Sequence, residues 1–162
     1  MLNGGDVVSR QKNHLVTFMK SFLIRIIVLV IVSALAQAQD NVTPSGYGKG
    51  RITLSDDVVY EGELQGLVFS GKGKLVWPDG HQYEGEFKNG LRHGQGLSTF
   101  PNGDRYEGGF QNDKFHGKGK LSFHNGHAYE GDFQHGKRQG QGVFSTLEGY
   151  RYQGQFDNDQ FH

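Results

Sequence analysis

Apolar and polar side chains alternate along short stretches of this chain, and the alternation recurs at a fixed interval. In Tyr83-Glu84-Gly85-Glu86-Phe87, the aromatic residues and the glycine fall on one side of an extended chain and both glutamates on the other. A similar stretch begins at tyrosines that follow one another every 23 residues: Tyr60, Tyr83, Tyr106, Tyr129 and Tyr152. The pattern predicts one β-strand per tyrosine and a repeat architecture.

A second alternating segment follows each tyrosine strand and begins with a Gly-x-Gly pair, as in Gly94-Gln95-Gly96. Signals such as Pro101-Asn102-Gly103 predict tight turns, whereas connections such as Lys88 to His93 are expected to be longer and polar. Each unit should therefore form a β-hairpin that folds only when stacked on its neighbours. We expect an all-β fold: an elongated, single-layer antiparallel array of β-hairpins with a period of 23 residues.

A glycine between Tyr and Phe in every unit requires a reason, because glycine normally weakens a strand. Its missing side chain leaves room for an aromatic ring of an adjacent strand or repeat. The aromatic residues themselves are expected to pack within the sheet, although part of the stripe is an alternative docking surface for a sugar or a peptide.

The segment from Tyr83 to Gly96 resembles the MORN (membrane occupation and recognition nexus) repeat. The resemblance covers residues 47–162, as a half repeat, four full repeats and a truncated final repeat. It implies a hairpin-repeat fold and an interaction module that occurs in many kinds of protein, and the motif itself carries no catalytic residue. Together with the N-terminal segment, it indicates an exported bacterial member of the family.

That N-terminal segment is apolar from Phe22 to Val32 and continues into Ser33-Ala34-Leu35-Ala36-Gln37-Ala38. An apolar stretch followed by small residues is typical of a secretory signal peptide. We expect translation to start at Met19 and the signal peptide, within residues 1–38, to be cleaved after Ala38. Residues 39–46 would then form a linker, and the mature protein would be secreted or periplasmic. The alternative is a membrane anchor formed by residues 22–38, which is short for a span and contains Arg25.

Composition excludes several classes of function. The chain has no cysteine, so disulfides and thiolate ligands are absent. Removing residues 1–38 takes away four of the 17 basic residues and one of the 17 acidic residues, which leaves 13 and 16. A slightly acidic protein is a poor ligand for nucleic acid, because phosphate binding needs an excess of Lys and Arg. No phosphate loop, nucleophile elbow or His-Glu-x-x-His helix is present, so we expect no enzyme, no catalytic residue and no cofactor.

Basic residues recur along one long edge of the predicted array and define a candidate surface for binding a partner. We call this set the basic edge: Lys88, Arg92, His93, Lys114, His116, Lys137 and Arg138. The edge would suit an acidic polysaccharide, a phosphate-bearing lipid or a protein, while the alternative is an ordinary solvated surface. We expect no metal site, because histidines one repeat apart are too distant to converge on one ion. The alternative role for these histidines is a hydrogen bond within their own loop.

The strand from Tyr152 to Phe156 is expected to have an unpaired edge, which invites a homodimer or a strand from a partner. The sequence as a whole favours a non-enzymatic protein-interaction or scaffold module of the cell envelope. The alternative is a lipid- or polysaccharide-binding module that acts through the basic edge.

Overall fold

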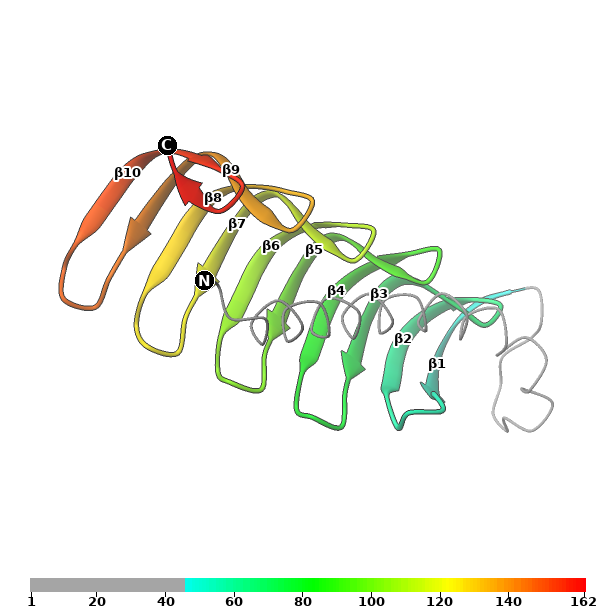
Figure 1. Ribbon diagram of the computed structural model, residues 1–162. Helices are drawn as coiled ribbons and strands as arrows, with labels where there is room; N and C mark the ends of the chain where they lie inside the picture. Colours follow the sequence, from blue (N-terminus) through cyan, green and yellow to red (C-terminus); the bar gives the residue numbers. More distant parts are fainter. Residues whose placement is uncertain (1–45) are drawn as a thin grey trace, which may run out of the picture. The chain divides into compact units, whose positions relative to one another are not determined.

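The computed structural model describes residues 46–162, which form one open antiparallel sheet (Figure 1). Its 11 strands follow one another in chain order, so each strand pairs only with its neighbours in sequence. The strands are β1 (Tyr47–Thr53), β2 (Val59–Gln65), β3 (Val68–Val76), β4 (Gln82–Lys88), β5 (Leu91–Thr99), β6 (Arg105–Gln111), β7 (Lys114–Ser122), β8 (Ala128–Gln134), β9 (Lys137–Ser145), β10 (Arg151–Asp157) and β11 (Gln160–Phe161).

The all-β hairpin array expected from the alternation is confirmed. In β4, Tyr83 and Phe87 are buried, whereas Glu84 and Glu86 are exposed. The predicted signal peptide and most of the predicted linker lie outside the described residues. Within residues 46–162, no helix is long and apolar enough to cross a membrane.

A line of paired glycines crosses the sheet, with one glycine on each of the strands β1 to β10; we call it the glycine seam. Its members are Gly50, Gly62, Gly73, Gly85, Gly96, Gly108, Gly119, Gly131, Gly142 and Gly154. The tyrosine of each even-numbered strand from β2 to β8 lies across two seam glycines. A Cβ atom at Gly85 or Gly96 would come within 2.5 Å of the Tyr83 ring or its hydroxyl.

The ring that fills the gap at each glycine is therefore the tyrosine two residues earlier in the same strand, which also covers the glycine of the next strand. A ring from an adjacent strand, as expected from the sequence, is found only at the glycines of the odd-numbered strands, such as Gly96. The Tyr83 hydroxyl donates a hydrogen bond to the Glu86 carbonyl at 2.9 Å, so its polar end is satisfied within the strand. Only glycine permits this close approach of a ring to the backbone.

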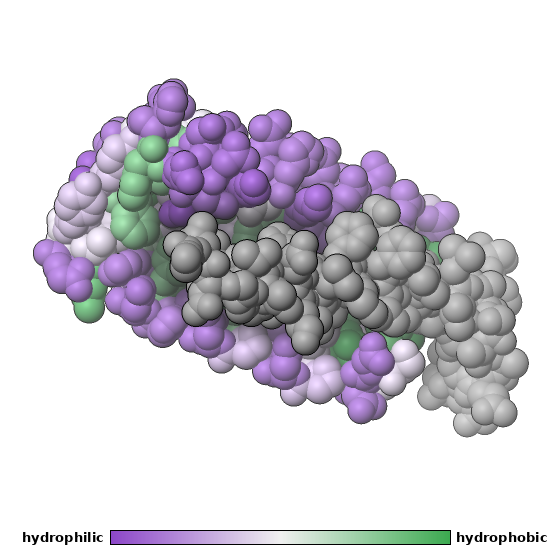
Figure 2. All heavy atoms as spheres, in the orientation of Figure 1, coloured by the Kyte–Doolittle hydropathy of each residue, from purple (hydrophilic) through white to green (hydrophobic). Residues whose placement is uncertain are grey.

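Adjacent repeats share one aromatic core. Tyr83 makes edge-to-face contacts with Phe87 at 5.1 Å and with Phe110 of the next repeat at 4.9 Å between ring centroids. Tyr106 contacts Phe110 and Phe133 in the same way. Each repeat thus depends on the next for burial of its tyrosine. In Figure 2 the visible rim of the array is largely hydrophilic, and hydrophobic atoms show most clearly near its C-terminal end.

The connections differ from the prediction. The connection from Lys88 to His93, expected to be long, contains only a two-residue turn, because β5 already begins at Leu91. Asn89 and Gly90 of this turn both have positive φ, 53° and 79°. These angles are those of a type I′ turn, the tightest common hairpin connection. The Pro78-Asp79-Gly80 turn is the longer of the two: the Trp77 N–H donates to the His81 carbonyl across it at 2.9 Å. The two-residue turns line the upper rim in Figure 1, and the Pro-Asp-Gly type loops line the lower rim.

The tightness of these turns also corrects the placement of the basic edge. Its residues lie on strands rather than in loops: Lys88 ends β4, Arg92 and His93 belong to β5, and the others stand at the beginning of β7 and β9. The pairing shifts by a bulge within the hairpins β2–β3, β4–β5, β6–β7 and β8–β9. Bulges bend and twist a strand, and the upper ends of the hairpins curl over accordingly (Figure 1).

Candidate interaction surfaces

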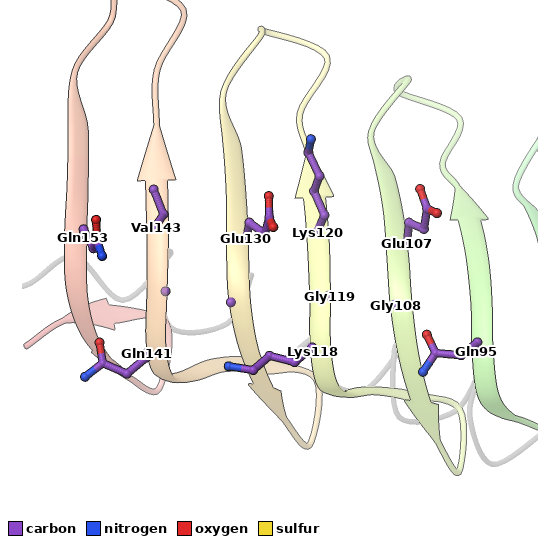
Figure 3. A pocket seen from close by; sticks show the side chains of 12 residues that line it. Gln95, Glu107, Gly108, Lys118, Gly119, Lys120, Glu130, Gln141, Val143 and Gln153 are labelled. Atoms are coloured by element: carbon purple, nitrogen blue, oxygen red, sulfur yellow. The ribbon is translucent and has the colours of Figure 1, made fainter.

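The face of the sheet opposite the tyrosines is polar, and a shallow groove of about 820 Å³ runs across it from β5 to β10. We call this surface the polar face. Backbone of the glycine seam forms the floor of the groove, because Gly108, Gly119, Gly131 and Gly142 line it without side chains. Figure 3 shows side chains in two rows on either side of this floor, all polar except Val143.

The rows carry alternating charge. Glu107 on β6 pairs in register with Lys120 on β7, which pairs in turn with Glu130 on β8. In the second row, Lys118 forms an ion pair with Asp132 at 2.7 Å. The basic members of the two rows are Lys49, Arg51, Lys72, Lys74, Lys118 and Lys120; the acidic members are Glu61, Glu63, Glu84, Glu86, Glu107, Glu130 and Asp132. The acidic side chains outnumber the basic ones by one, so the face is nearly neutral.

The two arginines of the basic edge are engaged within the array. The Arg92 side chain donates through Nε to the Asp113 carboxylate at 3.2 Å and through its terminal nitrogen to the Asp113 carbonyl at 3.0 Å. Its guanidinium also lies 5.5 Å from the ring centroids of both Tyr83 and Phe110. Arg92 is thus a clamp between the β4–β5 hairpin and the next turn.

Arg138 repeats this clamp two repeats later. Its side chain bonds the carboxylate and the carbonyl of Asp159 at 3.2 and 2.8 Å. Its guanidinium lies 5.6 and 5.7 Å from the ring centroids of Tyr129 and Phe156. About a fifth of each arginine side chain is exposed, which leaves little of it for a partner.

The lysines of the basic edge remain accessible. Lys114 and Lys137 are exposed at equivalent places in two successive repeats, at the start of β7 and β9, and Lys88 is exposed at the end of β4. Lys137 donates to Asn158 at 3.1 Å. His93 and His116 are half-buried, and the Nδ1 atom of each is buried without a hydrogen-bond partner among the described residues. The expected hydrogen bond from these histidines to their own loop is therefore not made by Nδ1. The binding role of the seven residues stays a prediction.

The opposite rim joins successive loops through histidine–carboxylate contacts. His124 donates its backbone N–H to the Asp104 carboxylate at 2.8 Å, and its Nδ1 lies 2.9 Å from the same oxygen. These hydrogen bonds, led by that of the His124 N–H, hold the pKa of Asp104 below its usual range. His127 lies 3.8 Å from Glu148 in the following loop. Among the described residues, no cluster of histidines and acids is arranged to hold a metal ion.

Comparison with known families accounts for the hairpins. The MORN repeat model matches residues 60–82, 83–105, 106–128, 129–146 and 152–162, which together make up more than half of the chain. The chain belongs to the MORN repeat family. MORN repeats are generally modules for interaction with proteins or membrane lipids, and the repeat itself is non-enzymatic.

No curated protein matches the sequence significantly. One similar solved structure is the TCP domain of SAS-4 (dCPAP) from Drosophila melanogaster, in complex with a proline-rich motif of Ana2 (dSTIL). It shares 12% sequence identity and a TM-score of 0.37 with this MORN protein, and the alignment covers 67% of this chain and 72% of that one.

The sequence also carries an alternation with twice the MORN period, which a comparison of neighbouring repeats does not reveal. Phe and Arg take turns at one register: Phe69, Arg92, Phe115, Arg138 and Phe161. Phe69 and Phe115 stack on the tyrosines of their own repeats at 3.9 and 3.7 Å between centroids. Arg92 and Arg138 take the corresponding places over Tyr83 and Tyr129. The signal stands in the sequence, but it appears only when each repeat is compared with the next but one.

Proposed function

We propose that this MORN protein is a non-enzymatic protein-interaction or scaffold module of the cell envelope, exported by a signal peptide that is cleaved after Ala38. The observation that carries the proposal is the near neutrality of the polar face, where basic and acidic side chains alternate and compensate one another. A polyanion such as nucleic acid or an anionic membrane surface needs a basic excess to be held. A protein partner with its own alternating charges is a better complement.

Capture from native envelopes by cross-linking tests this proposal. We expect the mature protein to retain a polypeptide with little loss when salt is raised from low to physiological concentration. The paired change Lys118→Glu and Lys120→Glu should abolish the capture, because both exposed side chains line the groove. The matched control changes Lys88, Lys114 and Lys137 to Glu on the basic edge and should leave capture intact.

The second candidate function is binding of anionic lipid or acidic polysaccharide through the basic edge. The observation that favours it is the exposure of Lys88, Lys114 and Lys137 beside the two-residue turns of three successive repeats. In this case vesicles containing phosphatidylserine, or an immobilised acidic glycan, would retain the protein, and retention would fall steeply with salt. The variant with Lys88, Lys114 and Lys137 changed to Glu would then lose binding, and the variant with Lys118→Glu and Lys120→Glu would keep it.

Export and self-association are separate parts of the proposal. N-terminal sequencing of the native protein should begin at Gln39, and a protein that retains residues 1–18 would contradict the start at Met19. Self-association would use Tyr152 to Phe156 of β10, which pairs with β11 only at Phe156 and Asp157 among the described residues. Light scattering should show a dimer, and a monomer at high concentration would rule self-association out.

A further inference from the structure

Three large rings stand one repeat apart on the tyrosine side of the sheet, at the entrance to the lower loops. Trp77, Phe100 and Phe123 each follow directly after the end of β3, β5 or β7. Successive rings are separated by two strands, about 9.6 Å at the usual strand spacing. That separation leaves room for one planar group stacked between each pair of rings. We call the two spaces the first slot, between Trp77 and Phe100, and the second slot, between Phe100 and Phe123.

The first slot is filled by the chain itself. The imidazole of His81 lies 4.3 Å from the Trp77 ring and 4.9 Å from the Phe100 ring, with interplanar angles of 15° and 10°. Its Nε2 lies 3.2 Å from the hydroxyl of the fully buried Ser98. Burial lowers the pKa of His81, so this ring is neutral at physiological pH. The array thus shows that such a slot accepts one planar nitrogenous group.

The second slot has no such ring from the described residues. The residue one repeat after His81 is Asp104, which cannot stack and whose carboxylate turns to His124. A hollow of about 410 Å³ lies here, lined by Phe100 and Phe123 together with Phe115, Leu121, Pro101, Asn102 and Asp104. The second slot therefore combines the rings of Phe100 and Phe123 with a carboxylate at its rim.

The same combination holds an arginine at two other places in this chain. Arg92 lies over Tyr83 and Phe110 and pairs with Asp113, and Arg138 repeats the arrangement with Asp159. A guanidinium is planar, stacks on aromatic rings and remains charged, so aromatic faces beside a carboxylate are its natural complement. A lysine ammonium is charged but is not planar, so it cannot stack on the rings. A neutral ring can stack but carries no charge to pair with the carboxylate.

We propose that the second slot binds an arginine side chain of a partner polypeptide, with the guanidinium stacked between Phe100 and Phe123 beside Asp104. This inference rests on the proposed protein-binding function and names one side chain that the partner presents. The slot lies on the tyrosine side of the sheet, so it is distinct from the groove of the polar face.

NMR titration of the full-length protein with small peptides tests the slot directly. The probe is N-acetyl-Gly-Arg-Gly-amide, and the comparison peptides carry citrulline, which is planar and neutral, or lysine in place of arginine. The arginine peptide should shift the ring resonances of Phe100 and Phe123 and bind about tenfold more tightly than either comparison peptide, the factor expected from 1–2 kcal/mol of cation–π and ionic attraction. Equal binding of the citrulline peptide, or no shift with any peptide, would overturn the proposal.

Two substitutions at one position separate charge from shape. Asp104→Asn keeps an acceptor for the His124 N–H and removes the charge, so binding of the arginine peptide should fall about tenfold. Asp104→His should fill the slot with the chain's own ring, as His81 does, and eliminate the shifts at Phe100 and Phe123. An unchanged far-ultraviolet circular dichroism spectrum would show that both variants fold, and retained binding by Asp104→His would contradict the slot.

The reciprocal substitution supplies the matched control. His81→Asp should empty the first slot and create a second arginine site between Trp77 and Phe100.

The experiments distinguish failure of the slot from failure of the proposed function. A protein that binds the arginine peptide but captures no polypeptide contradicts the proposed function alone. Undiminished capture of a polypeptide by Asp104→His contradicts the slot alone.

Discussion

The β4–β5 and β6–β7 hairpins have the same backbone arrangement, and each buries one tyrosine. They cover their tyrosines in different ways. In β4–β5, the guanidinium of Arg92 lies over Tyr83 and is tied to Asp113 of the next repeat. In β6–β7, Phe115 stacks on Tyr106 at 3.7 Å with an interplanar angle of 12°. The β4–β5 hairpin thus covers its tyrosine with a cation held by a carboxylate, whereas the β6–β7 hairpin covers its tyrosine with a second apolar ring.

The following turn changes together with this residue. After Arg92 and Arg138, the second turn residue is Asp113 or Asp159; after Phe69 and Phe115, it is Gly90 or Gly136. In all four cases its N–H donates to the carbonyl of the Arg or Phe at 2.9–3.1 Å. Both aspartates have positive φ, 66° and 72°, a conformation that glycine adopts at no cost. The ion pair offsets that strain where aspartate is used, so the true structural unit is a pair of repeats.

Alkaline unfolding should give the largest effect and tests what both kinds of repeat share. Burial raises the pKa of Tyr60, Tyr83, Tyr106 and Tyr129, to about 12 for Tyr60 and Tyr129. Unfolded tyrosines ionise near pH 10, so stability is full below pH 10 and is lost as the pH rises toward and beyond 12. Each tyrosine should remove up to about 1.4 kcal/mol per pH unit in that window.

Denaturant titrations between pH 8 and 11 measure this loss. Tyr129→Phe is the control: it removes one ionising group and should make the decline of unfolding free energy with pH shallower. A denaturation midpoint that does not move between pH 9 and 11 would show that the tyrosines ionise freely in the folded array.

Substitution in the glycine seam should come next. Gly96→Ala and Gly119→Ala each place a Cβ atom 2.5 Å or slightly more from the tyrosine that lies across that glycine. Both should cost about 3 kcal/mol or more, because the ring cannot move away from the backbone without leaving the core. Thermal unfolding should give similar decreases in Tm for the two variants. A large difference between them would mean that the two kinds of repeat differ at the seam as well.

Truncation of the alternating residue separates the two kinds. Phe115→Ala should cost about 2–3 kcal/mol, because it uncovers Tyr106 and leaves a cavity. Arg92→Ala should cost about 1–2 kcal/mol, because it breaks one partly exposed ion pair and the cation–π contacts with Tyr83 and Phe110. Only the Arg92 variant should lose its difference from the parent protein at high salt. Salt-dependent destabilisation by Phe115→Ala would contradict the distinction.

A double-mutant cycle should give the smallest effect and the sharpest test. Arg92→Phe alone removes the ion pair and leaves Asp113, with positive φ, only the backbone N–H of residue 92 as a donor to its carboxylate. Asp113→Gly alone removes the carboxylate and leaves Arg92 only the carbonyl of residue 113 as an acceptor. The double variant converts this repeat to the Phe–Gly kind and should recover about 1–2 kcal/mol relative to the sum of the single variants. Additive effects in denaturant unfolding would show that the residue and the turn vary independently.

The sequence was sufficient to predict the strands, the face that each side chain takes and the interval of the hairpins, because alternation is a local property. It did not predict the lengths of the connections. Asn89-Gly90 is the stronger type I′ signal, but the polar residues around it were interpreted as a loop instead of as strand ends. The position of the Tyr83 ring over two glycines could not be predicted either, because the placement of the ring depends on the curvature of the sheet.

The candidate basic edge was predicted only in part, because a row of charges along a sequence does not reveal which of them have partners. Lys88, Lys114 and Lys137 are exposed as expected, whereas Arg92 and Arg138 are clamps between hairpins. Their partners, Asp113 and Asp159, follow 21 residues later in the chain. Comparing every second repeat would have shown the covarying pair.

Pairing of repeats also restricts how such a protein can lengthen or shorten. Deleting 23 residues after Arg92 would bring His135-Gly136 against the arginine and leave it without a carboxylate. Deleting 46 residues would preserve the order of arginine and phenylalanine and rejoin matching surfaces. Insertions and losses in this gene are therefore expected to keep the phase of the array, in steps of two hairpin units.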